Sequence, residues 1–481
     1  MDGVSVFVER VRGGVRRRFC VDRRALAVFR VTLGVVVLAD LSMRARDLRV
    51  FYTDDGVLPR ETLAELFPGI ARFSLHSLSG ALWAQVVLFG VSALFAVALL
   101  VGYRSRTSAF VSLVLLVSLY ARNPFVLNGG DTMLLVALLL GSTLPIGARW
   151  SVDALGRDDA PSETVFSVAG AVLLVFLVVI YASNAVLRYR GELWMSGDAV
   201  RSVFGLESVT VLLGPYLAEM PALLVVINWM WVAMLTVSVL LLLLTGWLRA
   251  FLTGAFVVAH LGMALTLRLG VFPFVVIALL LLFLPPVFWD RFETHVPSGF
   301  GSRGPDAFAV SRARLTPESA RRALRRGASA TAVVILVTVL FWQGAALGYV
   351  EAPGDSVGAH PENYAWKMYS PTPPQTDGWY VVPVELRSGE TIDGIHRTSV
   401  EWDAPLDLAD AYPTILWYRY LSEMRYSSET QKRAFAEYVC DSVSEEEGEV
   451  LSVGVYYVER EVVLDGTGDE DRVELLKHDC S

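Results

Sequence analysis

Long apolar segments alternate with short polar, arginine-containing segments along most of this chain. A helix needs about 20 predominantly apolar residues to cross a bilayer. Six runs approach that length: Ala25–Met43, Ala81–Tyr103, Val165–Leu187, Ala222–Leu244, Leu248–Leu267 and Ala330–Tyr349. Three others are shorter and also fit re-entrant or bundle-core helices: Thr107–Tyr120, Asp131–Ile146 and Leu269–Leu284. The pattern predicts a polytopic all-α membrane bundle of about nine transmembrane helices over residues 25–350.

Arginine positions predict how this bundle is oriented. Cytoplasmic flanks of membrane helices favour Lys and Arg. Seven arginines lie in residues 1–24, and a second basic segment occupies residues 290–329. With nine spans both segments fall on one side, so we expect a cell-membrane protein with a cytoplasmic N-terminus and an extracytoplasmic C-terminus. The first outer loop is the exception, with five arginines between residues 44 and 72.

The last part of the chain, residues 351–481, predicts a small extracytoplasmic α+β domain. Alternating apolar positions predict strands, and helical spacing predicts helices. The predicted strands are Trp379–Arg387, Glu390–Ile395 and one or more within Val450–Leu464; the predicted helices are Ile415–Arg425 and Ser428–Val443.

Composition agrees with this division. Hydrophobic residues make up 54% and charged residues 19%, whereas soluble domains have roughly 25% charged residues, so the composition disfavours a bulk-soluble enzyme. Residues 351–481 hold 27 acidic and 10 basic residues, a net charge of −17, and the rest of the chain has a net charge of +9. No lysine precedes Lys367. Low lysine with an acidic exterior is typical of halophilic archaea, and GC-rich coding gives the same bias.

Two of the three cysteines lie in the acidic domain. Cys440 and Cys480 would be exposed to an oxidising exterior, whereas Cys20 lies in the basic flank. Disulfides persist in oxidising compartments, so we expect a Cys440–Cys480 bridge. Two unrelated thiols are the alternative.

His260 is a candidate catalytic residue because it lies inside an apolar run. Ionisable residues at membrane depth are costly and commonly functional, and histidine titrates near neutral pH. It is a candidate for proton transfer. The alternative is a structural histidine that donates to a backbone carbonyl of the bundle.

A second group of candidates follows the fifth run. Asn184, Arg188 and Glu192 recur at i, i+4 and i+8, and Trp194 comes next. On one helix face Arg188 and Glu192 could bind and orient an anionic group. The alternative is an interfacial ion pair with Trp194 as an aromatic anchor.

Two further candidates lie on the expected outer side. Asn128 and Asp131 frame two glycines before an apolar run, where free backbone N–H groups can hold an anion or where Asp131 is simply an N-cap. His76 lies in the first outer loop, as a ligand-binding or an interfacial histidine. Because all these candidates fall on one side, they favour an outward-facing cavity roofed by the acidic domain.

Other chemistries have no signature in the sequence. It contains no P-loop, no C-x-x-C and no H-x-x-x-H motif. We therefore expect no metal site and no nucleic-acid partner. Internal repeats, which are typical of many transporters, are not visible.

Several motifs together resemble a known family. They are YTDDGVLPR (Tyr52–Arg60), LPIGARWSVDAL (Leu144–Leu155), NAVLRYRGELWMSG (Asn184–Gly197) and the segment Ala259–Asp290, with WKMYSPTPPQTDGW (Trp366–Trp379) in the tail. In this order they resemble the HTTM (horizontally transferred transmembrane) family, prokaryotic relatives of vitamin K-dependent gamma-glutamyl carboxylase.

The resemblance implies a carboxylase-like fold with an outer cavity. It implies a role for His260, which matches a histidine of the carboxylase, and places Arg188 where the carboxylase has the lysine that begins the chemistry. Arginine stays protonated in proteins, so lysine-based glutamate carboxylation is not expected.

Two classes of function follow from the sequence. In the first, the outer cavity binds a lipid-like ligand, with an isoprenoid quinone as one candidate. His260 then handles protons in redox-type chemistry, and Arg188 holds an anionic group. In the second, the bundle is not an enzyme: it anchors the acidic domain for an extracytoplasmic protein or peptide partner, or it transports a solute. Membrane lipid is a partner in both.

Overall fold

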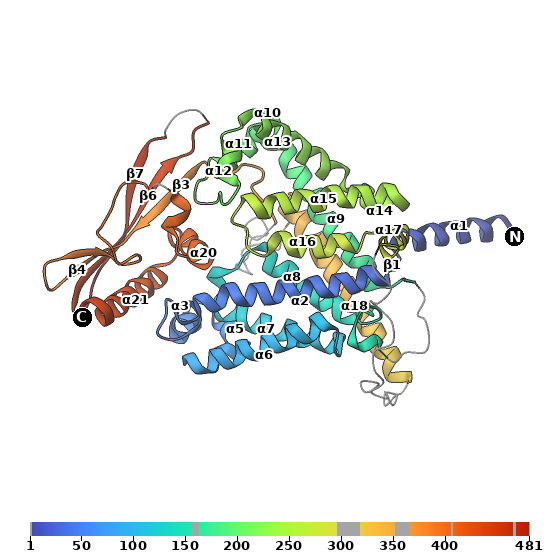
Figure 1. Cartoon of the computed structure of the whole chain (residues 1–481), viewed down its shortest axis with the longest axis horizontal. Coiled ribbons are helices and arrows are strands. Elements are labelled where there is room, and N and C mark those ends of the chain that lie inside the picture. The colour runs from blue at the N-terminus through green and yellow to red at the C-terminus, as the bar shows by residue number, and fades with distance from the viewer. Residues whose placement is uncertain are drawn as a thin grey trace.

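The protein is a long helical body with a small mixed domain at one end (Figure 1). The computed structural model describes residues 2–155, 163–295, 318–351, 366–405, 407–464 and 468–480. Helix α1 (Asp2–Phe19) projects from the opposite end of the body. The helical body therefore separates the basic N-terminal helix from the acidic C-terminal domain. Most of the basic segment 290–329 lies outside the described residues.

The body contains helices of very different lengths. The longer ones are α2 (Arg23–Arg46), α6 (Leu82–Val101), α7 (Ser105–Arg122), α8 (Gly129–Thr143), α9 (Val168–Tyr189), α13 (Pro221–Thr236), α15 (Gly246–Thr266), α16 (Phe272–Leu281) and α18 (Glu318–Ala346). Short helices join them: α3 (Leu48–Tyr52), α4 (Arg60–Leu66), α5 (Pro68–Ala71), α10 (Glu192–Ser196), α11 (Ala199–Phe204), α12 (Gly214–Ala218), α14 (Leu240–Leu243) and α17 (Pro286–Glu293). Short 3₁₀ turns and one small antiparallel pairing, β1 (Val21–Asp22) with β2 (Thr164–Val165), complete the body.

Six helices in the described part of the chain are long and apolar enough to cross a membrane: Arg23–Arg46, Leu82–Val101, Val168–Tyr189, Pro221–Leu243, Gly246–Thr266 and Arg322–Ala346. The three shorter runs form α7, α8 and α16. Helix α8 has only 15 residues. Helices α16 and α17 bend by 96° and would make a seventh span if counted as one; prolines at residues 285 and 286 explain the break.

A multi-pass helical membrane protein is therefore what the structure supports, and the expected nine spans are not confirmed. Hydropathy alone cannot separate a short crossing helix from a helix that is apolar because its neighbours bury it. Helix α8 is such a case: it packs against α7, α9 and α16.

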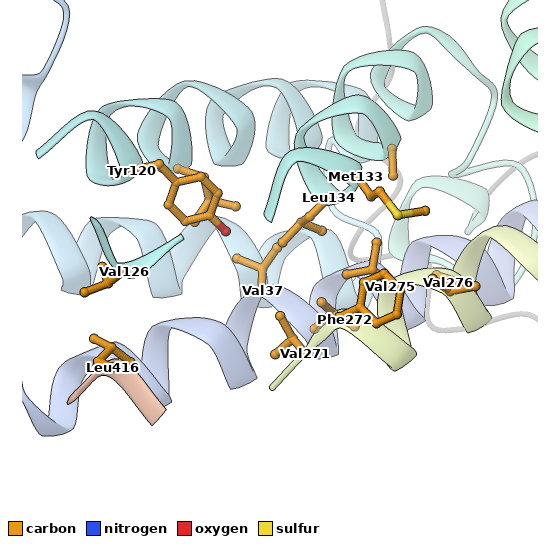
Figure 2. Close-up of a cluster of buried hydrophobic side chains, with 14 of the residues drawn as sticks. Val37, Tyr120, Val126, Met133, Leu134, Val271, Phe272, Val275, Val276 and Leu416 are labelled. Carbon is orange, nitrogen blue, oxygen red and sulfur yellow. The ribbon is translucent and has the colours of Figure 1, made fainter. Parts of the chain in front are cut away.

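The interior of the bundle is filled by aliphatic and aromatic side chains. Figure 2 shows Val37 of α2, Leu134 of α8 and Val275 of α16 in one cluster of buried side chains. Leu416 of the C-terminal domain belongs to the same cluster as Val126, which lies just before α8. In a bilayer, close packing of this kind holds helices together, because lipid tails are as apolar as leucine.

In its described residues, the C-terminal domain is a five-stranded antiparallel sheet with two α-helices. Its strands are β3 (Thr376–Val381), β4 (Pro383–Leu386), β5 (Thr391–Asp393), β6 (Val450–Glu461) and β7 (Glu470–Asp479). The long strand β6 pairs with β3, β4 and β7, and β4 also pairs with β5. Helix α21 (Glu429–Glu447) lies against β6 and β7, and α20 (Ile415–Met424) lies at the bundle.

The α+β prediction for this domain is confirmed in outline. The strand expected over Trp379–Arg387 is interrupted at Val382 and forms β3 and β4. Strand β7 was not predicted, because its charged residues hide the alternation. A disulfide joins Cys440 of α21 to Cys480 after β7, with a Cα–Cα separation of 5.9 Å.

Buried polar contacts dock this domain on the bundle. Arg419 of α20 donates to the carbonyl of Val126 at 3.0 Å and lies 3.5 Å from Asp131 of α8. Asp131 also pairs with Arg44 of α2 at 2.9 Å, and Arg44 pairs with Asp40. All four charged side chains are buried. Removing one partner of such a cluster leaves an uncompensated buried charge, so docking is part of the fold.

Candidate binding cavity

A cavity of about 1620 Å³ lies within the bundle. Its walls come mainly from α11, α13, α15 and α18, and a segment that follows α18 in the sequence crosses one end. We call this segment, Trp366–Ser370, the strap. Binding cavities for drug-sized molecules have volumes of about 300–1,000 Å³, so this cavity has room for a larger ligand.

Helix α15 forms the longest wall. Its lining residues run from Phe251 to Thr266, which is a distance of about 22 Å at 1.5 Å per residue. Phe251 is 81% exposed and Val258 is 68% exposed, although both line the cavity. Protein therefore does not seal the cavity along this part of α15.

Small residues on α15 create this space. Gly254, Ala255, Ala259 and Gly262 lie on the cavity face at helical spacing. A Cβ atom added at Gly254 or Gly262 would meet no atom within 4 Å. The volume therefore comes from side chains that are missing from one helix face.

Arg188 marks the polar end of the cavity. It lines the cavity at the end of α9 and is only 2% exposed. Its guanidinium donates to Asn184 Oδ1 at 3.0 Å and to the carbonyl of Met368 at 2.9 Å, and it lies 4.2 Å from the ring centroid of Trp194. The guanidinium also donates to the carbonyl of Asn184 at 3.3 Å and to Ser370 Oγ at 3.5 Å. The cation–π contact and these four hydrogen bonds hold the charge in place.

The strap is held by the residues that the sequence grouped around Arg188. Asn184 Nδ2 donates to the carbonyl of Trp366 at 2.6 Å, and Trp194 Nε1 donates to the carbonyl of Tyr369 at 3.0 Å. With the Arg188 bond, three strap carbonyls are fixed by three predicted residues. Met368 and Tyr369 have positive φ angles of 44° and 61°, a conformation that costs non-glycine residues energy.

A comparison with known protein families identifies the bundle. The HTTM domain matches residues 20–289, more than half of the chain. This protein belongs to the HTTM family. The match runs from α2 into α17, so α18, the strap and the C-terminal domain lie outside it. Neither the curated proteins nor the solved structures include a match.

Asn128 and Asp131 of the HTTM domain form a helix cap rather than an open anion site. Asn128 Oδ1 accepts from the N–H groups of Gly130 and Asp131, and Asp131 Oδ2 accepts from the N–H of Asn128 at 2.7 Å. Both side chains of this capping box therefore occupy the N–H groups that an anion would need. Asp131 also forms ion pairs with Arg44 and Arg419, so its carboxylate oxygens already have partners.

His260 does not line the cavity. It is fully buried on the opposite face of α15, where its Nδ1 lies 2.8 Å from the carbonyl of Phe256. Its ring lies 5.7 Å from that of Trp231, and Nε2 lies 3.5 Å from the hydroxyl of Tyr181. These contacts fit the alternative role expected from the sequence, a structural histidine bonded to a backbone carbonyl. Here the ring also lies within an aromatic cluster.

Glu192 and His76 lie apart from the cavity. Helix α9 ends at Tyr189, and Glu192 begins α10 with an exposed side chain, so the i, i+4 spacing does not continue to it. His76 is buried, with Nδ1 at 2.7 Å from Ser118 Oγ. Burial, with a smaller contribution from Arg122, lowers the pKa of His76 to about 4.

The cavity also holds charged residues that sequence reasoning missed. Lys367 of the strap and Glu423 of α20 both line it. Each lies after residue 350 in the sequence and is brought to the cavity by the tertiary fold. No local sequence pattern therefore predicts that it lines the cavity. Among the described residues, no group of three His, Cys, Asp or Glu side chains could hold a metal ion.

Proposed function

We propose that this HTTM protein binds a lipid-like amphiphile in its cavity, on the side of the membrane that carries the C-terminal domain. The cavity supports this most directly: it has apolar walls over about 22 Å, exposed lining side chains at Phe251 and Val258, and a polar end at Arg188. A ligand that enters from the bilayer would place its chain along α15 and its head near the strap.

An isoprenoid quinone is one candidate ligand, as the resemblance to the carboxylase implies. Its apolar chain suits the wall of α15, and Arg188 and Lys367 supply donors for quinone oxygens. The proposal covers binding rather than catalysis. Arg188 stays protonated and cannot act as a base, and His260, the other expected catalytic residue, faces away from the cavity.

The rival function is a membrane anchor that presents the acidic domain to a protein or peptide partner. If the bundle only presented the C-terminal domain to a partner, few contacts between the domain and the bundle would be needed. Here Arg419 penetrates to Asp131, Asp47 accepts from Thr414 at 2.6 Å, and Ser208 bonds to Asp377. These contacts between the C-terminal domain and the bundle favour a role for the domain in shaping the cavity. Transport stays a prediction without a specific observation in its favour.

Co-purification tests the proposed function. The full chain is purified in a mild detergent, and bound quinones and lipids are measured by mass spectrometry. We expect a stoichiometric amphiphile in the wild type, a reduced amount in Arg188→Gln, and an unchanged amount in His260→Gln if that variant folds. Wild-type protein with only detergent-exchangeable lipid would contradict the proposal.

The orientation is a separate proposal that rests on the charge split and on the opposite positions of α1 and the C-terminal domain (Figure 1). A membrane-impermeant maleimide on intact cells should not label Cys20. It should label Cys440 and Cys480 only after reduction, because the two are bridged. Labelling of Cys20 without lysis would overturn the orientation.

A further inference from the structure

The charges at the polar end of the cavity are unbalanced. The charged side chains that line the cavity, among the described residues, are Arg188, Lys367 and Glu423. Glu423 is exposed, whereas Lys367 is half-buried and Arg188 is buried. No carboxylate in the described ranges lies within 4.0 Å of either cation. Among the described residues, the inner part of this end therefore carries only positive charge.

Arg188 also has an unused donor. Its Nε is buried and has no hydrogen-bond partner within the described structure. Arg44, which is equally buried, pairs with two aspartates. A buried charge without a counter-ion is costly, and an unpaired buried donor adds to that cost. An anionic group in the cavity would relieve both.

We propose that Arg188 and Lys367 form a binding site for an anionic headgroup, so that the ligand is an amphiphile with a carboxylate or phosphate head and an apolar chain. This inference rests on the proposed function and specifies its ligand class. The head lies between the strap and the end of α9. The chain runs along the small-residue face of α15 toward Phe251.

Four probes separate the headgroup from the chain. Oleate and oleyl alcohol share a chain and differ in charge, as do a lysophosphatidate and a monoacylglycerol. Equilibrium binding of each radiolabelled probe is measured with the delipidated full-length protein. We expect the anionic member of each pair to bind at least about tenfold more tightly, the difference that charged hydrogen bonds produce. Comparison of oleate with lysophosphatidate shows whether a carboxylate or a phosphate is preferred.

Variants assign the difference to the two cations. Lys367→Gln should weaken binding of the anionic probes by about tenfold or more and leave the neutral probes within twofold. Arg188→Gln should do the same, but it also removes a strap contact and tests the site only if it folds. Lys367 has no ion pair in the described structure, so Lys367→Gln keeps the proposal falsifiable. Lys477→Gln is the matched control, because Lys477 lies on the exposed strand β7.

The outcomes distinguish the two levels of the proposal. Equal affinity of wild type for charged and neutral partners, unchanged in Lys367→Gln, would overturn the headgroup site and leave the cavity proposal intact. Failure of all four probes to bind would overturn both. A loss of anionic binding in Lys477→Gln as large as in Lys367→Gln would show that only net charge matters, which would also overturn the assigned site.

Discussion

Filling the cavity from α15 should abolish ligand binding without damaging the fold. Gly262 lies inside this helix, and a Cβ atom added there would meet nothing within 4 Å. Gly262→Leu therefore directs a branched side chain from this position toward the cavity. Glycine in a helix interior costs about 0.8–1 kcal/mol relative to alanine, and leucine is nearly as favourable as alanine. We expect the delipidated variant to be slightly more stable, by about 0.5–1 kcal/mol.

Gly90→Leu is the matched control for this prediction. Gly90 lies inside α6, also has no atom within 4 Å of an added Cβ, and does not line the cavity. Thermal unfolding of both delipidated variants in detergent should show a small rise in Tm of about 2 °C or less. Mass spectrometry should then show loss of the co-purified amphiphile in Gly262→Leu alone.

Retention of the wild-type amount of ligand by Gly262→Leu would contradict this prediction. A loss of about 1–3 kcal/mol, the usual cost of overpacking, in that variant but not in Gly90→Leu would also contradict it, because the site would then be filled by protein.

Three further predictions concern stability. Arg419→Gln should cost about 1.5–3 kcal/mol, because the neutral side chain leaves Asp131 with one partner fewer; limited proteolysis should then release the C-terminal domain more readily, and unchanged release would contradict the docking account. Loss of the disulfide in the Cys440→Ser, Cys480→Ser double variant should cost about 3–4 kcal/mol for its sequence separation of 40; an unchanged unfolding midpoint would refute this. Burial lowers the pKa of His76 to about 4, below the unfolded value of about 6.5, so the unfolded chain binds more protons as pH falls. The protein should therefore lose about 3 kcal/mol between pH 6.5 and 4 from this residue, and His76→Asn should reduce that loss; equal acid sensitivity in the variant would contradict the assignment.

The sequence predicted much of the polar end of the cavity. Asn184 and Arg188 are one helical turn apart, so local geometry alone places them together, and Trp194 follows a short break at Gly191. Because α9 ends before Glu192, the i, i+4 spacing that grouped Glu192 with Arg188 does not place the two side chains on one helix face. Their common partner, the strap, is about 180 residues away and could not be inferred from local spacing.

The position of His260 could not be inferred in the same way. Helix α15 is apolar on most of its surface, so hydropathy does not show which face meets the cavity and which meets the bundle. The glycines and alanines at helical spacing carry that information, since small residues leave space or allow close approach. The sequence cannot decide between those two outcomes, and the structure shows space at Gly254 and Gly262.

The number of spans could not be predicted from the sequence for a different reason. A run such as that of α8 is apolar whether it touches lipid or protein, and its 15 residues lie between the two cases. Charge placement fits nine spans but does not demonstrate them. The α+β domain was easier to predict, because alternation and helical spacing differ clearly in a soluble sheet domain.

Photo-crosslinking can show directly whether the cavity holds an amphiphile. A fatty acid and its fatty alcohol, each with a diazirine at mid-chain, are bound to the purified protein, irradiated, and mapped by peptide mass spectrometry with and without excess unlabelled competitor. At least one probe should label Phe251–Thr266 of α15 in a saturable manner, whereas labelling of the lipid-facing helix Leu82–Val101 should be weak and insensitive to competitor. Equal, non-saturable labelling of both helices by both probes would show that the cavity does not hold an amphiphile.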